Sequence, residues 1–354
     1  MGYNFPNAPT VGQAYGNYVW DSEKWQLPKG VTPDRATIYA APFDALAYNG
    51  MQINGSMEVD QEYGGAGASW AAGSAVSKYV IDGFNILKTS ATVAFNAQQV
   101  ASVFPGYLKE IKITITTAQP AIGSDIIVLD NNIEGYRFMR AGWGTPNAQP
   151  VSIGMWVKSS VAGTYQIAVV NSAQDTAATG SFTITAANTP QFVTITFPGV
   201  TTGTWLTTNG IGARLRVFLA LAGFANLAAA NLNIFETTGW IFLPGLELPN
   251  VSRAPLIMRP FDQELVTCQR YYEIGSALTY WGYSGGPGNY GTTARSFITP
   301  KRAVPTITVA NLSYGNASNY TQNSVTIDGF DFFMTVPTAG SFWSRFSYIA
   351  DARL

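Results

Sequence analysis

Apolar and polar side chains alternate with a period of two over several short stretches of this 354-residue chain. The clearest stretches are residues 111–116, 151–157 and 193–197, and residues 165–170 and 181–185 are two further strand candidates. A period of two is typical of a β-strand with one buried face. Turn formers such as Pro and Gly separate the stretches. We therefore expect an all-β chain with a jelly-roll β-sandwich over residues 51–258.

Two other regions also bear on the fold. Residues 213–232 are rich in Ala and Leu, which favour a helix. Apolar residues nevertheless alternate over 214–220, so we expect a strand there and a short loop helix at 225–231. Alternation returns at 330–336, which predicts a smaller C-terminal β-domain over 274–354. Such a small apolar domain is expected to pack against a partner or a symmetry mate.

Residues 259–273 differ from the rest because they predict a short helix. Pro260 suits a first helical turn, and Asp262 and Glu264 favour the positive end of the helix dipole. Spacings of four, three and four place four side chains on one apolar stripe, namely Phe261, Leu265, Cys268 and Tyr272. We expect this helix to link two β-domains, with its cysteine packed as a small hydrophobe instead of acting as a nucleophile.

Composition narrows the classes of function. Charged residues make up 12% of the chain, against roughly 25% in average soluble proteins. There is no His and only one Cys, which excludes an intrachain disulfide, His-bound metals and Ser-His-Asp or Cys-His catalysis. The net charge is −1 without a long basic run, so we do not expect nucleic acid as a partner. No apolar run reaches the roughly 18 residues of a membrane span, so we do not expect membrane insertion.

We expect residues 1–50 to form an extended, non-globular N-terminal segment, because they contain five prolines. Within this segment, Tyr18–Trp20 and Trp25 flank a turn-like stretch and predict a small hairpin. An isolated hairpin is marginal in water, so it is expected to pack on something else. A flexible tail with a few aromatic residues is the alternative. The start lacks the features of a signal peptide, which predicts synthesis in a cytoplasm and release by lysis or assembly.

Carboxylates are the remaining candidates for catalysis, since glycosidases work with a pair of them. The candidates are Glu58, Asp60, Glu62, Asp125, Asp130 and Glu134. The sequence selects no pair among them, and on a strand residues 58, 60 and 62 would share one face, where like charges repel. We expect neither an enzyme nor a catalytic or metal-binding residue, and no cofactor. A structural calcium ion held by loop oxygens stays open as an alternative.

Residues 280–291 combine aromatic side chains with five glycines and one proline, which predicts an exposed, turn-rich loop. The aromatic residues are Tyr280, Trp281, Tyr283 and Tyr290. Exposed Trp and Tyr present apolar faces with polar edges, and the C–H faces of sugar rings can stack on them. These four residues are therefore candidates for glycan binding. Packing between subunits also enriches Tyr and Trp, and it stays the alternative.

Several motifs resemble those of bacteriophage tail-fibre and related virion proteins. Residues 261–272, Phe-Asp-Gln-Glu-Leu-Val-Thr-Cys-Gln-Arg-Tyr-Tyr, resemble a joint between a jelly roll and a C-terminal β-domain. Residues 53–61, Ile-Asn-Gly-Ser-Met-Glu-Val-Asp-Gln, resemble the opening of that phage jelly roll. Residues 79–84 are similar to a later element, although Gly83 and Phe84 replace its usual Arg and Trp. Further matches follow in family order, at residues 133–135, 142–148, 153–157, 202–205 and 238–248.

Both ends of the chain resemble the same family. Residues 342–354 are similar to the ending of phage fibre C-terminal domains. Residues 5–25 resemble short N-terminal modules of phage tail and fibre proteins, which implies that they attach the protein to the virion. The resemblance makes five residues candidates for this attachment, namely Phe5, Pro6, Tyr18, Trp20 and Trp25.

The resemblance implies a bacteriophage virion protein, a fibre or spike of the tail or the head, on the virion surface. It implies an attachment segment (1–50), a carbohydrate-binding-like jelly roll (51–258), a linking helix (259–273) and a fibre-type C-terminal domain (274–354). We expect a homotrimer that binds other virion proteins through its N-terminal segment and contacts host surface polysaccharide. A connector or decoration protein that touches no glycan is the alternative, and a polysaccharide depolymerase is the less favoured one.

Overall fold

The computed structural model describes residues 8–11, 13–15, 18–20, 22–23, 25–26, 50–246, 248–291 and 295–354. The chain divides into two compact units, Met1–Leu46 and Ala47–Leu354. In the first unit, three short antiparallel strands form a sheet: β1 (Ala14–Tyr15), β2 (Tyr18–Trp20) and β3 (Trp25–Gln26). Trp20 pairs with Trp25 across β2 and β3, so the predicted hairpin is confirmed.

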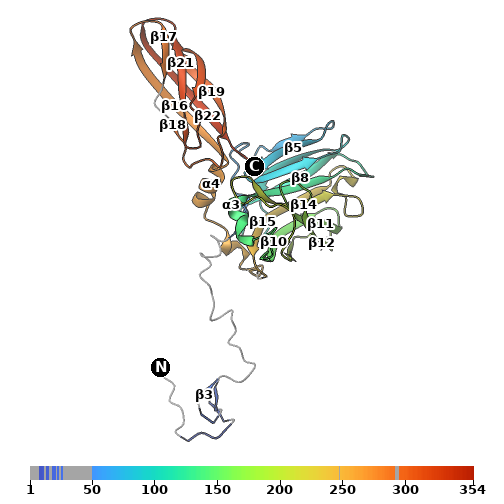
Figure 1. Cartoon of the computed structure of the whole chain (residues 1–354). Coiled ribbons are helices and arrows are strands. Elements are labelled where there is room, and N and C mark those ends of the chain that lie inside the picture. The colour runs from blue at the N-terminus through green and yellow to red at the C-terminus, as the bar shows by residue number, and fades with distance from the viewer. Residues whose placement is uncertain are drawn as a thin grey trace. The chain divides into compact units, whose positions relative to one another are not determined.

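The second unit begins with two six-stranded antiparallel sheets, coloured blue to yellow in Figure 1. In spatial order, the first sheet consists of β13 (Gln191–Phe197), β10 (Val151–Ser159), β15 (Ile234–Pro244), β8 (Lys109–Thr117), β7 (Ala94–Ala101) and β4 (Ala68–Trp70). The second consists of β12 (Ala177–Ile184), β11 (Gly163–Val170), β14 (Ile211–Ala220), β9 (Ile127–Glu134), β6 (Phe84–Lys88) and β5 (Val76–Ile81).

The strand order of the two sheets defines a jelly roll. The first strand of the eight-stranded core, β8, pairs with the last one, β15. The second strand, β9, pairs with the last but one, β14. This nesting continues outward to β10 and β13 in one sheet and to β11 and β12 in the other. Nested antiparallel pairs divided between two sheets are the double Greek key of a jelly roll. Strands β4 to β7 extend the sheets by two strands each.

The alternation in the sequence decides which side chains fill the sandwich. Ile111, Ile113 and Ile115 on β8 are fully buried in one large core. Burial of each such side chain contributes roughly 1.5–3 kcal/mol. Phe84 stacks edge-on against Trp240 at a centroid distance of 5.1 Å. Phe84 is therefore an aromatic residue of the core.

Helix α4 (Phe261–Gln269) lies where the sequence predicts a helix. Pro260 is the N-cap residue, and Asp262 and Glu264 lie in the first turn, as expected for the positive end of the dipole. Cys268 is buried, and burial raises the pKa of its thiol well above the ordinary range. The thiol therefore stays protonated, in agreement with a packing role.

The apolar stripe predicted for this helix is partly wrong. Phe261 is 53% exposed, and Tyr272 belongs to the strand that follows the helix. Glu264 is buried instead, although a charged group is normally kept in water. It tolerates burial because the Arg259 guanidinium lies 3.1 Å from its carboxylate and the Asn54 backbone N–H donates to it over 2.8 Å.

The described residues contain two α-helices, and the sequence did not predict the second one. This helix, α3 (Gly135–Phe138), is four residues long and follows β9. The described residues also contain three 3₁₀ turns, namely η1 (Met139–Ala141), η2 (Leu227–Ala229) and η3 (Ala254–Ile257). The turn η2 matches the loop helix expected at 225–231, and β14 confirms the strand over 214–220.

After α4 the chain forms a second, smaller β-structure, in orange and red in Figure 1. One sheet contains β16 (Tyr272–Ser284), β22 (Gly340–Asp351) and β19 (Thr306–Gly315). The other contains β17 (Gly288–Gly291), β21 (Gly329–Val336), β18 (Arg295–Ser296) and β20 (Ser318–Asn323). The core includes Phe330, Phe332 and Met334 of β21. The fold is all-β, as the sequence predicts.

Candidate functional site

Strand β16 sends successive side chains to opposite faces of its sheet. Leu278 and Tyr280 pack against the C-terminal core. Trp281 and Tyr283 point the other way and are 78% and 74% exposed. The structure thus divides the aromatic residues proposed for glycan binding between two faces.

Tyr280 and Tyr290 lie on the inner face. Their ring centroids are 6.0 Å and 5.2 Å from the ring centroid of Phe342 on β22. The Tyr290 hydroxyl also shares a hydrogen bond with the hydroxyl of Ser284. These contacts give both tyrosines a place in the packing of the C-terminal domain.

The exposed loop predicted over 280–291 is wrong for most of its length. Strand β16 continues through Ser284, and β17 begins at Gly288, so only residues 285–287 remain as a turn. Glycine fits this strand because Phe342 fills the space beside Gly282. A β-carbon at position 282 would lie 2.7 Å from Cζ of that ring. The glycines of this segment therefore have two roles. Gly282 leaves space for Phe342 within the strand, and others belong to the turn.

The two exposed aromatic residues of β16 meet a third one on β22. Trp281 lies directly opposite Trp343 in the antiparallel register, and Tyr283 lies opposite Ser341. Trp343 is 42% exposed, because its indole covers Gly315 on the next strand, β19. A β-carbon at position 315 would lie 2.5 Å from Trp343 Nε1. We call Trp281, Tyr283 and Trp343 the outer aromatic face.

Sequence reasoning missed Trp343 as a member of this face. The sequence signal was weak: exposed and buried positions alternate over residues 341–349 of β22, but Trp343 is an exposed position and Ser344 a buried one, so apolar and polar residue types do not follow the alternation there. What the alternation could not supply was the register that brings Trp343 opposite Trp281.

Arg345 is the next outward residue along β22 after Trp343. Its neighbours in the register are Thr279 on β16 and Ser313 on β19. Within the described residues, Arg345 is exposed and has no hydrogen bond or ion pair. A guanidinium with free donors therefore lies beside the outer aromatic face.

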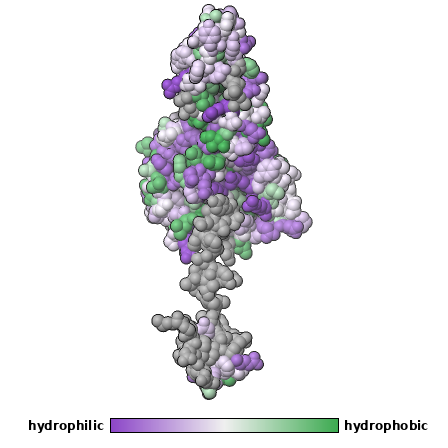
Figure 2. All heavy atoms as spheres, turned by 90° about the vertical axis from the view of Figure 1, so that its left-hand side faces the viewer, coloured by the Kyte–Doolittle hydropathy of each residue, from purple (hydrophilic) through white to green (hydrophobic). Residues whose placement is uncertain are grey.

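Figure 2 shows that the C-terminal domain, at the top of the view, is mostly pale, which marks intermediate hydropathy. Its strands are rich in Tyr, Trp, Thr, Ser and Gly, and few of its residues are charged. Trp and Tyr combine an apolar body with a polar edge, so they bind partners that offer both C–H faces and hydroxyl groups. Sugar rings have this character.

Two of the six candidate carboxylates are buried beside arginines in the sandwich. The Asp130 carboxylate accepts two hydrogen bonds of 2.8 Å from the Arg216 guanidinium. Glu134 accepts from Arg270 over 2.7 Å and 2.9 Å, and from the Tyr271 hydroxyl over 2.7 Å. Glu134 also lines a cavity of about 360 Å³, and no second carboxylate of the described residues lines it. A glycosidase needs two.

The other four candidates also contact protein groups. Asp125 accepts hydrogen bonds from the Thr89 hydroxyl and the Gln119 amide, each over 3.2 Å. Residues 58–62 belong to no strand, so the shared strand face considered for them does not form. Asp60 accepts from two backbone N–H groups of its own turn, and Glu62 pairs with Arg353. Burial, with a smaller contribution from Glu264, raises the pKa of Glu58.

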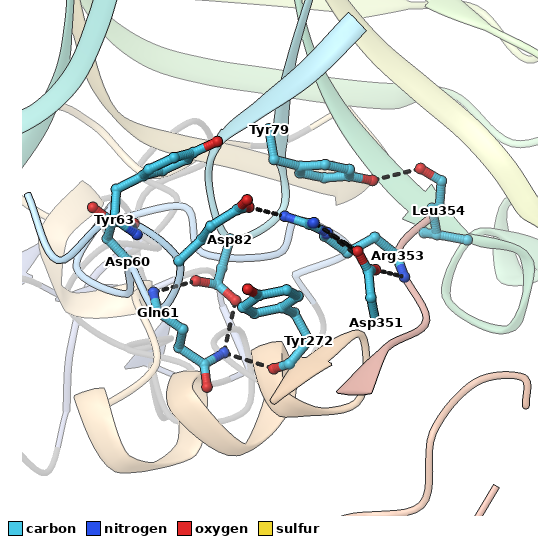
Figure 3. Close-up of polar contacts among 10 residues, drawn as sticks. Asp60, Gln61, Tyr63, Tyr79, Asp82, Tyr272, Asp351, Arg353 and Leu354 are labelled. Carbon is cyan, nitrogen blue, oxygen red and sulfur yellow. Dashed lines mark hydrogen bonds and ion pairs between the residues drawn. The ribbon is translucent and has the colours of Figure 1, made fainter. Parts of the chain in front are cut away.

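Figure 3 shows how residues 351–354 contact the sandwich. The Arg353 guanidinium lies 4.6 Å and 4.3 Å from the ring centroids of Tyr79 and Tyr272. It also pairs with Asp351 over 2.6 Å. The Tyr79 hydroxyl donates to the backbone oxygen of Leu354. These contacts join the C-terminal strand to the jelly roll, and we call Arg353, Tyr79 and Tyr272 the arginine clasp.

Asp82 lies in the same cluster, and no cation among the described residues forms an ion pair with it. Its carboxylate accepts from the Gln61 backbone N–H over 2.8 Å and from the Gln61 amide over 2.7 Å. Burial raises the pKa of Asp82 to about 6, against the lowering effect of these hydrogen bonds. The amide of Gln61 also donates to the backbone oxygen of Tyr272, so it links the jelly roll to β16.

Three further findings concern the other predicted sites. Among the residues that the structure describes, no group of three or more Asp, Glu, Cys or His side chains could hold a metal ion. Within the same residues the longest helix, α4, has nine residues, and none of the helices could span a bilayer. Of the attachment candidates, Tyr18 and Trp20 lie on β2 and Trp25 on β3, while Phe5 and Pro6 lie outside the described residues.

No protein-family model matches the chain, and no curated protein matches it. Among solved structures, it is similar to the enzymatically active domain of tailspike protein 4 of bacteriophage CBA120, with 10% identity and a TM-score of 0.34 over 56% of this chain. The match spans only 22% of the tailspike chain. It is also similar to the family 11 carbohydrate-binding module of a Clostridium thermocellum cellulase, with 12% identity and a TM-score of 0.29. That match covers 51% of this chain and 99% of the module. Likenesses at this level do not say what this chain binds.

Proposed function

We propose that this chain is a bacteriophage virion protein, a fibre or spike of the tail or the head, that contacts host surface polysaccharide. The observation that carries the glycan contact is the outer aromatic face, with Trp281 directly opposite Trp343 and both exposed. The virion assignment rests on the motifs over residues 51–354, which resemble those of phage fibre proteins in order. The N-terminal segment attaches the protein to the particle, and its aromatic candidates Tyr18, Trp20 and Trp25 take part.

We further propose a homotrimer, because phage fibres of the resembled kind are trimers. Several copies of one weak sugar site bind a repeating polymer far more tightly than a single copy does. Light scattering after size-exclusion chromatography of the full chain tests the assembly, and we expect three times the monomer mass of 38.0 kDa. A stable monomer at micromolar concentration would contradict the trimer.

Binding of the purified chain to a panel of bacterial capsular and O-antigen polysaccharides tests the glycan contact. We expect Trp281→Ala and Trp343→Ala each to weaken binding by roughly ten-fold or more, because exposed aromatic anchors dominate such contacts. Phe261→Ala is the matched control, since it removes an aromatic ring that is 53% exposed on α4. Equal binding by all four proteins would rule out the outer aromatic face as the contact.

A connector or decoration protein without glycan binding is the second candidate. It is favoured by exposed apolar residues elsewhere in the C-terminal domain, such as Ile298 and Val304, at 64% and 62% exposure. Where such residues form a contiguous patch, they mark a protein interface. This role would be supported if the purified protein bound no polysaccharide but restored the function of phage particles that lack the protein. A change of oligomeric state in Trp281→Ala would place the outer aromatic face between subunits.

We propose contact without cleavage, because each of the six candidate carboxylates contacts protein groups and no pair faces the outer aromatic face. The viscosity of a bound polysaccharide is therefore expected to stay constant during prolonged incubation with the full chain. A steady fall in viscosity would favour a depolymerase.

A further inference from the structure

The outer aromatic face carries one positive charge at a fixed place. Arg345 and Trp343 point to the same side of β22 and are two residues apart, which separates them by roughly 7 Å along the strand. Thr279 and Ser313, the neighbours of Arg345 across the sheet, have short hydroxyl side chains. They leave the guanidinium uncovered. An arginine side chain can therefore reach a substituent of a ring that stacks on the Trp343 indole.

No negative charge on the described part of this sheet face neutralises Arg345. The nearest outward carboxylate on β22 is Asp351, six residues farther along the strand, and it already pairs with Arg353 over 2.6 Å. Asp331 lies on β21, which belongs to the other sheet. In a chain with only 12% charged residues, an exposed arginine one outward position from the Trp343–Trp281 pair is a specific feature.

The chemistry of arginine indicates what this charge would recognise. Its planar guanidinium offers parallel donors that match a carboxylate or a phosphate group, and such charge-assisted pairs are stronger than neutral hydrogen bonds. The indole beside it excludes water from one side of the pair, which lowers the local dielectric and strengthens the attraction. A neutral glycan would use the aromatic rings but would leave the guanidinium unpaired.

We infer that the outer aromatic face takes an acidic polysaccharide, in which a sugar ring stacks on Trp343 and its anionic group pairs with Arg345. This inference rests on the proposed glycan contact. The anionic group is a carboxylate, as in a uronic acid, or a phosphate. Trp281 and Tyr283 extend the stacking surface toward the neighbouring sugar.

The experiment compares binding of the full chain to acidic and neutral forms of one polysaccharide. The acidic capsular polysaccharide that binds best in the panel is tested before and after its carboxyl groups are reduced to alcohols. Arg345→Gln removes the charge, and Arg345→Lys keeps the charge without the planar pair of donors. Arg140→Gln is the matched control, because Arg140 is also exposed and has no ion pair within the described residues.

We expect Arg345→Gln to weaken binding of the acidic form by roughly ten-fold, with an intermediate loss for the lysine variant and none for the control. If carboxyl reduction of the polysaccharide removes this difference, the group recognised is a carboxylate. If the difference survives reduction, the group is a phosphate. The inference would be overturned if wild type and Arg345→Gln bound the acidic and the reduced form equally well while Trp343→Ala still lost binding. That result would leave the proposed glycan contact intact. Absence of binding to every polysaccharide would overturn both.

Discussion

At the residue scale, a few fully buried charges stand out in a chain that has few charges. Glu273 and Lys301 are completely buried in the C-terminal domain, with 2.6 Å between the Lys301 Nζ and the Glu273 carboxylate. The Tyr348 hydroxyl and the Ile298 backbone N–H also donate to this carboxylate. Such a network is stable only while every member keeps its partner, because an unpaired buried charge is costly.

Lys301→Met should therefore lower the free energy of unfolding by about 3–5 kcal/mol, since it leaves Glu273 buried without its cation. Urea denaturation of the wild type and the variant measures this loss. The double variant Lys301→Met/Glu273→Gln should recover much of it, because glutamine is neutral and still accepts from Tyr348. A double variant no more stable than Lys301→Met would show that lost packing, not the unpaired charge, causes the damage.

Asp82 predicts a pH dependence of stability. Burial raises its pKa from 3.8 to about 6, so the folded chain binds the proton more tightly than the unfolded chain does. The contribution of Asp82 is then complete below its unfolded pKa and is lost as pH rises through its folded pKa. The full shift corresponds to about 3 kcal/mol. Urea denaturation at several pH values between about 4 and 7 should show wild type losing stability relative to Asp82→Asn. A constant difference between the two proteins would contradict this.

At the element scale, the candidate site depends on how three strands pair. Trp281, Trp343 and Gly315 come from β16, β22 and β19 and lie in one row across the sheet. The indole of Trp343 can lie flat over the backbone of β19 because Gly315 has no side chain in that space. The element pairing, more than any single residue, thus creates the flat part of the outer aromatic face.

Gly315→Ala should tilt this indole, because the new methyl group would lie 2.5 Å from Trp343 Nε1. We expect a shift in tryptophan fluorescence and weaker polysaccharide binding, in the direction of Trp343→Ala but smaller. Gly285→Ala is the control, since a β-carbon there meets nothing within 4 Å. If Gly315→Ala keeps wild-type fluorescence and affinity, the indole does not depend on Gly315.

At the scale of the whole molecule, contacts between distant parts of the sequence hold the C-terminal strand to the jelly roll. The arginine clasp places Arg353 between Tyr79 of the sandwich and Tyr272 of β16, at 4.6 Å and 4.3 Å from their ring centroids. Cation–π contacts of this kind contribute up to about 2 kcal/mol when partly desolvated. The clasp therefore couples the unfolding of the two β-structures.

Arg353→Ala should lower the free energy of unfolding by about 2 kcal/mol, because it removes both ring contacts and the ion pairs with Asp351 and Glu62. It should also speed amide hydrogen exchange at the end of β22. Arg345→Ala, eight residues earlier on β22, is the control and should change stability by less than about 0.5 kcal/mol, since that side chain is exposed and has no partner among the described residues. Equal effects of the two variants would contradict the role of the clasp.

Much of the fold could be predicted from the sequence, because local pattern decides local structure. The period of two identified β8, β10 and β13, and the two further strand candidates became β11 and β12. Alternation also predicted β14 correctly, although its surroundings are rich in Ala and Leu. The position of α4 also followed from local signals. Local signals did not predict which face of that helix is buried. Glu264 is buried because Arg259 and the distant Asn54 backbone satisfy it, and no local period carries that information.

The candidate site shows the same division between sequence and structure. The sequence alone determined that residues 280–291 are aromatic and glycine-rich, and that strands alternate on either side of α4. Only the tertiary structure decided that Tyr280 and Tyr290 pack inside, and that Trp343 and Arg345 join Trp281 and Tyr283 outside. The physical reason is that side-chain alternation is a property of one strand, whereas the neighbours of a residue depend on the register with strands far away in the sequence.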